Sequence, residues 1–160
     1  MEARLLIMGV GNYLMGDEGV GVHAAQLLSR LSLPPGVDVV DGGTGGFHLL
    51  EYFEKYPRVI LIDATLDGNK AGSIRLIRPR FAADFPKSMS THDIGLKDMM
   101  SSLQLLGKIP DIHLFVVSIE FIQQQGVELT DEVEAAMPEL LQQVTALTDK
   151  LVFPSEPVTN

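Results

Sequence analysis

Apolar residues in this chain occur in two alternating patterns, short continuous runs and longer stretches with helical spacing. The runs predict strands at residues 4–8, 37–40, 59–63, 73–77 and 112–119. The helical spacing predicts helices at residues 20–31, 47–56, 90–103 and 133–151, with Pro138 expected to kink the last one or to begin a new first turn. This alternation of strands and helices predicts a three-layer α/β/α sandwich around a mostly parallel sheet.

One strand of this sheet is expected to run antiparallel. Only a short turn, Asp67-Gly68-Asn69, separates the runs at residues 59–63 and 73–77. A parallel crossover needs about a dozen residues or more, so a turn of this length cannot supply one. We therefore predict an antiparallel strand near residues 73–77. The 160-residue length suits one domain, residues 1–153, followed by a polar tail at residues 154–160.

The charge balance argues against nucleic acid and anionic membranes as partners. Twelve Lys and Arg residues against 21 Asp and Glu residues give a net charge of −9, which repels phosphate groups. No run of about 18 apolar residues is present, and the first ten residues lack the pattern of a secretion signal, so a cytoplasmic location is expected. The chain has no cysteine, so any metal would be bound by nitrogen and oxygen atoms.

Acidic residues follow three of the predicted strands. Glu18 lies in the loop after the first, Asp41 ends the second and Asp63 ends the third, while His92 lies in the predicted first turn of a helix whose N-terminus, Ser90-Thr91-His92-Asp93, fits a capping box. Parallel strands bring their carboxyl ends to one edge, where ligands bind in open α/β sheets. Two carboxylates and an imidazole there suit a divalent cation.

Structural roles compete with this interpretation. Asp17 is better explained as the N-cap of the first helix than as a ligand, and for Glu18 the structural alternative is a first-turn acid that stabilises the helix dipole. Asp63 ends a wholly apolar strand, where a carboxylate must be paired or coordinated, so a buried ion pair also fits. His23, His48 and His113 are expected to be solvated or part of the core.

The glycines after the first strand also allow a dinucleotide-binding interpretation. Gly9 and Gly11 begin such a fingerprint, and Asp41 resembles the acid that binds a ribose, but Leu14 stands where the third glycine is required. The residues therefore favour a metal-binding site over the dinucleotide-binding site of an oxidoreductase. The chain has none of the common serine-hydrolase, Walker or zinc-protease motifs.

Four ordered motifs together resemble the [NiFe]-hydrogenase maturation endopeptidases. They are Gly9-x-Gly11-Asn12-x-Leu14-x-x-Asp17-Glu18-x-x-Gly21, Asp41-Gly42-Gly43-Thr44, Ile62-Asp63-Ala64 and His92-x-x-Gly95-Leu96. The resemblance covers nearly the whole chain. It departs after the last strand, where Ser118-Ile119-Glu120-Phe121 replaces the usual apolar residue and proline, which leaves the shape of that loop open.

The resemblance implies a five-stranded sheet in the order 2-1-3-5-4 with the fourth strand antiparallel. It implies that Glu18, Asp63 and His92 contact metal and take part in catalysis. The partner implied is the hydrogenase large-subunit precursor, from which members of the family remove a C-terminal extension once nickel is in place. Nickel would then come from the substrate, and no organic cofactor is expected.

The sequence offers candidates for substrate binding and for catalysis, each with an alternative. The backbone N–H groups near Asp41, Gly42, Gly43 and Thr44 are candidates to bind the extended tail, although a tight strand-to-helix turn also explains the glycines. The attacking water could be activated at the metal or by another group such as Asp41. A non-catalytic nickel or hydrogenase docking chaperone is the remaining alternative.

Overall fold

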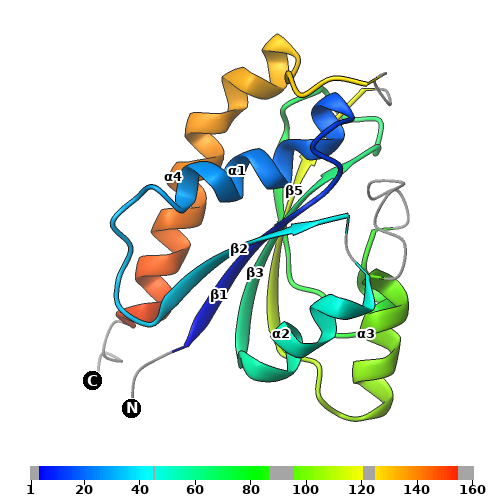
Figure 1. Cartoon of the computed structure of the whole chain (residues 1–160), viewed down its shortest axis with the longest axis vertical. Helices are drawn as coiled ribbons and strands as arrows, with labels where there is room; N and C mark the ends of the chain where they lie inside the picture. Colours follow the sequence, from blue (N-terminus) through cyan, green and yellow to red (C-terminus); the bar gives the residue numbers. More distant parts are fainter. Residues whose placement is uncertain (1–3, 45, 87–95, 121–124, 155–160) are drawn as a thin grey trace, which may run out of the picture.

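The protein is built around one five-stranded sheet with helices on both faces (Figure 1). The computed structural model describes residues 4–44, 46–86, 96–120 and 125–154. The strands are β1 (Leu5–Val10), β2 (Val37–Gly43), β3 (Arg58–Thr65), β4 (Ile74–Ile77) and β5 (Asp111–Ser118). The α-helices are α1 (Val20–Leu28), α2 (Leu50–Lys55), α3 (Leu96–Leu105) and α4 (Asp131–Val152), and the short 3-10 turns are η1 (Gly16–Gly19), η2 (Phe47–Leu49) and η3 (Ala82–Asp84).

The sheet order is β2-β1-β3-β5-β4, as the resemblance implied. β1 is parallel to β2 and β3, and β3 is parallel to β5. β4 pairs with β5 in the antiparallel direction, from Ile74 opposite Val117 to Ile77 opposite Leu114. The predicted fold class and the antiparallel strand are therefore confirmed.

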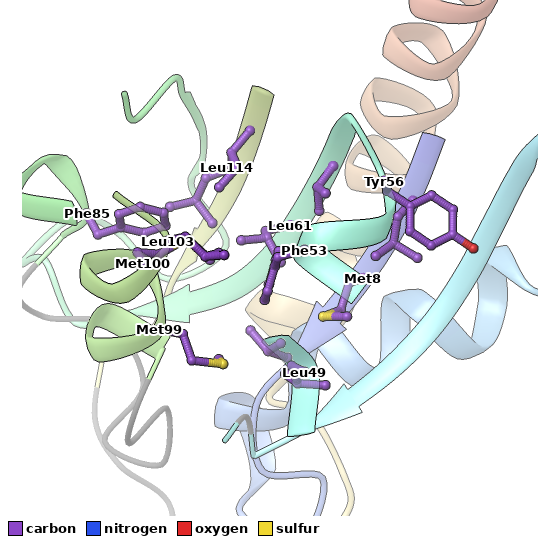
Figure 2. Packing of buried hydrophobic residues seen from close by; sticks show 14 of the residues in the cluster. Met8, Leu49, Phe53, Tyr56, Leu61, Phe85, Met99, Met100, Leu103 and Leu114 are labelled. Carbon is purple, nitrogen blue, oxygen red and sulfur yellow. The ribbon is translucent and has the colours of Figure 1, made fainter. Parts of the chain in front are cut away.

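Two hydrophobic clusters fill the space between the three layers. Successive side chains of a strand point to opposite faces, so Leu5 and Ile7 of β1 belong to the cluster under α1 and α4, while Leu6 and Met8 belong to the cluster under α2 and α3. Figure 2 shows the second cluster, in which Met8 lies among side chains from both helices and the neighbouring strands. Burial on both faces explains the continuous apolar runs in the sequence.

Several predicted boundaries are wrong. β2 and β3 continue beyond residues 40 and 63, since β1 still pairs with Gly43 and β5 still pairs with Thr65. Asp41 and Asp63 consequently lie inside strands instead of ending them. The apolar pattern stops at each aspartate, whereas the hydrogen-bonded pairing with the neighbouring strand continues past it.

The helices differ from prediction in a similar way. α1 stops at Leu28, because the residues that follow form hydrogen-bonded turns. α4 begins two residues earlier than predicted and continues through Pro138, so a new first turn at this proline is wrong. The predicted capping box at Ser90 lies outside the described residues, as does the tail at residues 155–160, so the domain boundaries stay a prediction. In the described ranges, no helix combines the length and apolar character needed to cross a membrane.

His113 is a core histidine, and we expect it to make stability depend on pH. The side chain in β5 is 4% exposed, and neither ring nitrogen has a hydrogen-bond partner among the described residues. Burial, assisted by the nearby positive charges of Arg78 and Arg58 and opposed by Asp111, lowers the pKa of His113 below its usual 6.5. Below pH 6.5 the unfolded chain therefore binds a proton that the folded chain resists, and stability falls as the pH falls.

Thermal unfolding between pH 7.5 and 5.5 measures this effect. We expect His113→Leu to lose less stability across that range than the unmodified protein. The matched control is His48→Gln, because His48 is exposed and should retain the original pH dependence. Equal pH dependence in the His113 variant and the unmodified protein would contradict the assignment.

Candidate functional site

Close packing between β1 and α1 positions the acidic turn η1 at the carboxyl edge of the sheet. A Cβ atom added at Gly9 would lie 1.9 Å from the carbonyl oxygen of Gly21, and one at Gly21 would lie 2.2 Å from that of Ile62. A Cβ at Gly11 would lie 2.1 Å from the carbonyl oxygen of Glu18. These distances leave no room for a side chain, so the spaced glycines are explained by backbone contact between the strand, the turn and the helix.

This packing also weakens the dinucleotide interpretation. In that fingerprint the helix N-terminus receives the pyrophosphate, and its glycines allow the phosphate to approach. Here the same turn carries Asp17 and Glu18, which are 2% and 0% exposed, and two carboxylates disfavour a phosphate at this position.

Glu18 and Asp63 are two fully buried carboxylates at the same edge of the sheet. Both are 0% exposed, and η1, which carries Glu18, contacts β3, which carries Asp63. The Oδ1 atom of Asp63 accepts a hydrogen bond of 2.8 Å from the N–H of Ala64. Both carboxylates lie at the carboxyl edge of the sheet, where open α/β sheets bind their ligands, so they are candidate functional groups.

Asp17 joins η1 to α4 and does not cap the first helix. Its Oδ1 accepts from the N–H of Thr130 at 2.8 Å, and its Oδ2 accepts from the hydroxyl of Thr130 at 2.7 Å. Thr130 is the N-cap of α4, whereas Met15 and Gly19 are the N-caps of η1 and α1, so Asp17 occupies no N-cap position. The predicted N-cap role of Asp17 is therefore wrong. Sequence could not show this contact, because 113 positions separate the two residues.

We expect this contact to stabilise the protein measurably. Asp17→Ala leaves the N–H and hydroxyl of Thr130 without their acceptor, which should cost about 1–3 kcal/mol. Thr130→Val removes only the hydroxyl and should cost less. Denaturant unfolding of both single variants and the double variant gives the coupling energy, and independent, additive losses would contradict the direct interaction.

The segment from Asp41 to Thr44 lies at the outer edge of the sheet. Asp41 is exposed, and its Oδ1 accepts from the N–H of Gly43 at 2.9 Å. Gly43 has a φ of 57°, and no atom lies within 4 Å of the position where its Cβ would be. Asp41 thus lies within the edge strand β2 and stabilises the backbone at Gly43, whose carbonyl oxygen accepts from the N–H of Gly11 at 2.7 Å.

His92, the third predicted metal contact, lies outside the described residues. In the described ranges, no group of three or more His, Cys, Asp or Glu side chains is arranged to hold a metal ion. The structure thus brings Glu18 and Asp63 to one sheet edge, and the contribution of His92 stays a prediction.

The prediction of a simple turn at residues 67–69 missed a structural role of Asp67. This carboxylate accepts hydrogen bonds from Asn69, Arg75 and Ser118 and so joins the loop after β3 to β4 and β5. Desolvation acts to raise the pKa of Asp67, but the hydrogen bonds from Asn69 and Ser118 and the charge of Arg75 outweigh it, and the pKa is lowered. The Asp-Gly-Asn turn composition hinted at the contact with Asn69, but the contact with Ser118, 51 positions away, could not be predicted from the sequence.

Comparison with known proteins agrees with these features. The sequence profile of the family described as hydrogenase maturation protease matches residues 22–147. The chain belongs to this family. The matched region includes Asp63 and the position of His92, while Glu18 precedes it.

Individual members of the family are similar over most of the chain. Hydrogenase 2 maturation protease of Escherichia coli K12 is 35% identical over 146 residues, which cover 89% of each protein. The hydrogenase expression/formation protein HupD of Bradyrhizobium diazoefficiens is 37% identical over 124 residues, which cover 74% of this chain and 63% of HupD. This chain thus matches less than two thirds of the length of HupD.

Solved structures of the family have the same fold. The hydrogenase maturating endopeptidase HybD from E. coli superimposes with a TM-score of 0.83 at 34% identity, covering 92% of this chain and 93% of HybD. The [NiFe] hydrogenase maturation protease HybD from Thermococcus kodakarensis gives a TM-score of 0.74 at 28% identity, covering 91% of this chain and 99% of that one. This similarity confirms the five-stranded α/β fold and the family resemblance inferred from the sequence motifs.

Proposed function

We propose that this maturation protease removes a C-terminal extension from the large-subunit precursor of a [NiFe] hydrogenase after nickel has been inserted. The observation that carries the proposal is the pair of fully buried carboxylates, Glu18 and Asp63, at the carboxyl edge of the sheet in a chain of this family. In this proposal the nickel arrives with the substrate and is not a resident cofactor. A cytoplasmic location stays a prediction.

The donor atoms of the proposed site suit a borderline divalent cation. Glu18 and Asp63 supply carboxylate oxygens, and His92 is proposed to supply an imidazole nitrogen, a set that binds nickel without thiolates. Contact with the nickel of the substrate would restrict cleavage to loaded precursors and hold the scissile region in one orientation. In this scheme the two carboxylates also position the attacking water and the proton that the leaving amine requires.

The outer edge of β2 is the proposed binding site for the extended tail. Among the residues that the structure describes, β2 pairs with β1 on one side only, so we infer that its other side accepts a further strand at Asp41, Gly42, Gly43 and Thr44. Gly43 itself is engaged, because its N–H donates to Asp41 and its carbonyl oxygen accepts from Gly11, so in this proposal the tail pairs with the neighbouring residues. Added-strand hydrogen bonds are independent of side chains and would fix the tail in an extended conformation.

Intact-mass measurement of the precursor tests the proposal. Nickel-loaded and nickel-free large subunits are incubated with the protein, and we expect mass loss from the loaded subunit only. Equal cleavage of the nickel-free subunit would refute the nickel requirement. Stable binding without mass loss would instead identify a docking chaperone.

A further inference from the structure

An apolar groove between α1 and α4 stands apart from the carboxylate pair. It has a volume of about 400 Å³ and is lined by Leu27 of α1 and by Leu129, Met137, Pro138 and Leu141 of α4 and the segment before it. Figure 1 shows these two helices lying together on one face of the sheet. His23 and Glu134 are the polar residues of its lining.

Acidic side chains surround the end of this groove that lies at the start of α4. Glu134 lines the groove, Asp131 lies three residues earlier on the same face of α4, and Glu128 precedes the lining residue Leu129. All three acids are exposed. The sequence has no lysine or arginine between Lys108 and Lys150, and none between Arg4 and Arg30. The end of the groove at the start of α4 is therefore acidic.

We propose that this groove binds a segment of the hydrogenase precursor that carries an apolar side chain next to lysine or arginine. The apolar side chain fills the space among Leu27, Met137 and Leu141. The basic residue lies toward the start of α4, where it faces Glu134 and Asp131. Such an arrangement, an apolar anchor with a charged rim, is common in specific protein interfaces.

Charge also argues against a second copy of this chain as the occupant. A symmetric contact through this face would bring two sets of the same acids together, and each copy already has a net charge of −9. Like charges facing each other across an interface are costly. A basic segment of another protein relieves this repulsion.

Hydrogen bonds connect the segment before α4, which lines the groove, to the turn that carries Glu18. Thr130, which follows the lining residue Leu129, is bound through two hydrogen bonds by Asp17, the neighbour of Glu18. Gly126 also pairs with the start of η1 and the loop before it, since its carbonyl oxygen accepts from Gly16 and its N–H donates to Leu14, each at 2.7 Å. A partner seated against α4 therefore contacts the segment that holds the turn carrying Glu18.

The inference rests on the proposed function, and one experiment separates the two. Binding and cleavage of the nickel-loaded large-subunit precursor are measured for the unmodified protein, for Glu134→Lys and Glu134→Gln, and for Leu141→Thr. Glu51→Lys is the matched control, because Glu51 is an exposed acid on α2, on the opposite face of the sheet. Thermal unfolding of each variant confirms that it is folded.

At low salt we expect Glu134→Lys to weaken binding about tenfold, equivalent to about 1.4 kcal/mol, with a smaller loss for Glu134→Gln. The loss should appear in KM and not in kcat, and Glu51→Lys should bind normally. Near 1 M salt, where charges are screened beyond about 3 Å, the Glu134 variants should approach the unmodified protein. Leu141→Thr should weaken binding at both salt concentrations.

Unchanged binding in the Glu134 and Leu141 variants, with normal cleavage, would overturn the groove assignment and leave the proposed function standing. Salt-sensitive binding that depends on Glu134 without any cleavage would support the groove and overturn the proteolytic function. No binding of the precursor by the unmodified protein overturns the inference. A salt-sensitive dimer of the protein alone, abolished by Leu141→Thr, would assign the groove to a second copy and also overturn it.

Discussion

Asp63→Asn should abolish removal of the C-terminal extension while the protein stays folded. The asparagine has the same shape, and its Oδ1 can still accept the hydrogen bond from Ala64 that Asp63 accepts. The negative charge is lost, and the second carboxylate oxygen becomes an NH2 donor that cannot bind a cation, at a position that is 0% exposed. Loss of one anionic ligand removes both charge complementarity and geometry at a cation site, so we expect at least about a 100-fold fall in the cleavage rate.

Precursor cleavage and thermal unfolding, measured on the same samples, check this result. Glu18→Gln should behave in the same way, and so should His92→Ala on the strength of its motif. Asp67→Asn is the matched control, because Asp67 is a carboxylate near the same edge with a structural network around it. It should lower the melting temperature and leave cleavage intact. An active but destabilised Asp63→Asn protein would rule out the proposed nickel contact.

Gly21→Ala should have the largest effect on folding. The added methyl group would lie 2.2 Å from the carbonyl oxygen of Ile62 and 2.4 Å from that of Val10, and both obstacles are backbone atoms of central strands. Neither strand can move without breaking its pairing, so the helix must shift. We expect a loss of more than about 3 kcal/mol, or a melting temperature lower by about 10 °C.

Gly107→Ala is the matched control for this substitution. Gly107 lies two residues after the end of α3 with a φ of 67°, and no atom lies within 4 Å of the position of an added Cβ. Its cost is therefore limited to the backbone conformation, about 1–2 kcal/mol. Soluble yield and denaturant unfolding distinguish the two variants. If Gly21→Ala were the milder of the two, the close contact between α1 and the sheet would not constrain the protein as described.

The sequence predicted the layers and the antiparallel strand because long-range packing leaves a local trace, whereas the strand order came from the resemblance to the family. Strands covered on both faces become continuous apolar runs, and the short turn near Asp67 excludes a parallel connection. The position of Asp63 within β3 could not be predicted in this way. The apolar run stops at Asp63, which predicts the end of the strand. Pairing with β5 instead continues two residues further, so the carboxylate is buried within the strand.

Local patterns also could not show what the acidic side chains contact. The sequence around Asp17 fits an N-cap whether this residue caps the first helix or contacts a distant segment. Only the folded chain shows that it binds Thr130, more than a hundred residues away. The glycines of the first loop similarly fit both phosphate binding and close helix packing. The absence of space for a Cβ at Gly9 and Gly21 favours packing.

The position of β5 in the sheet has a consequence for the order in which the chain folds. β3 and β4 follow each other in the chain, yet β5, the last strand to be synthesised, lies between them. Until residues 111–118 leave the ribosome, β4 has no partner strand and β3 has an open side. Completing the sheet is therefore a late, nonlocal step, and until then the exposed strand edges favour aggregation and chaperone binding.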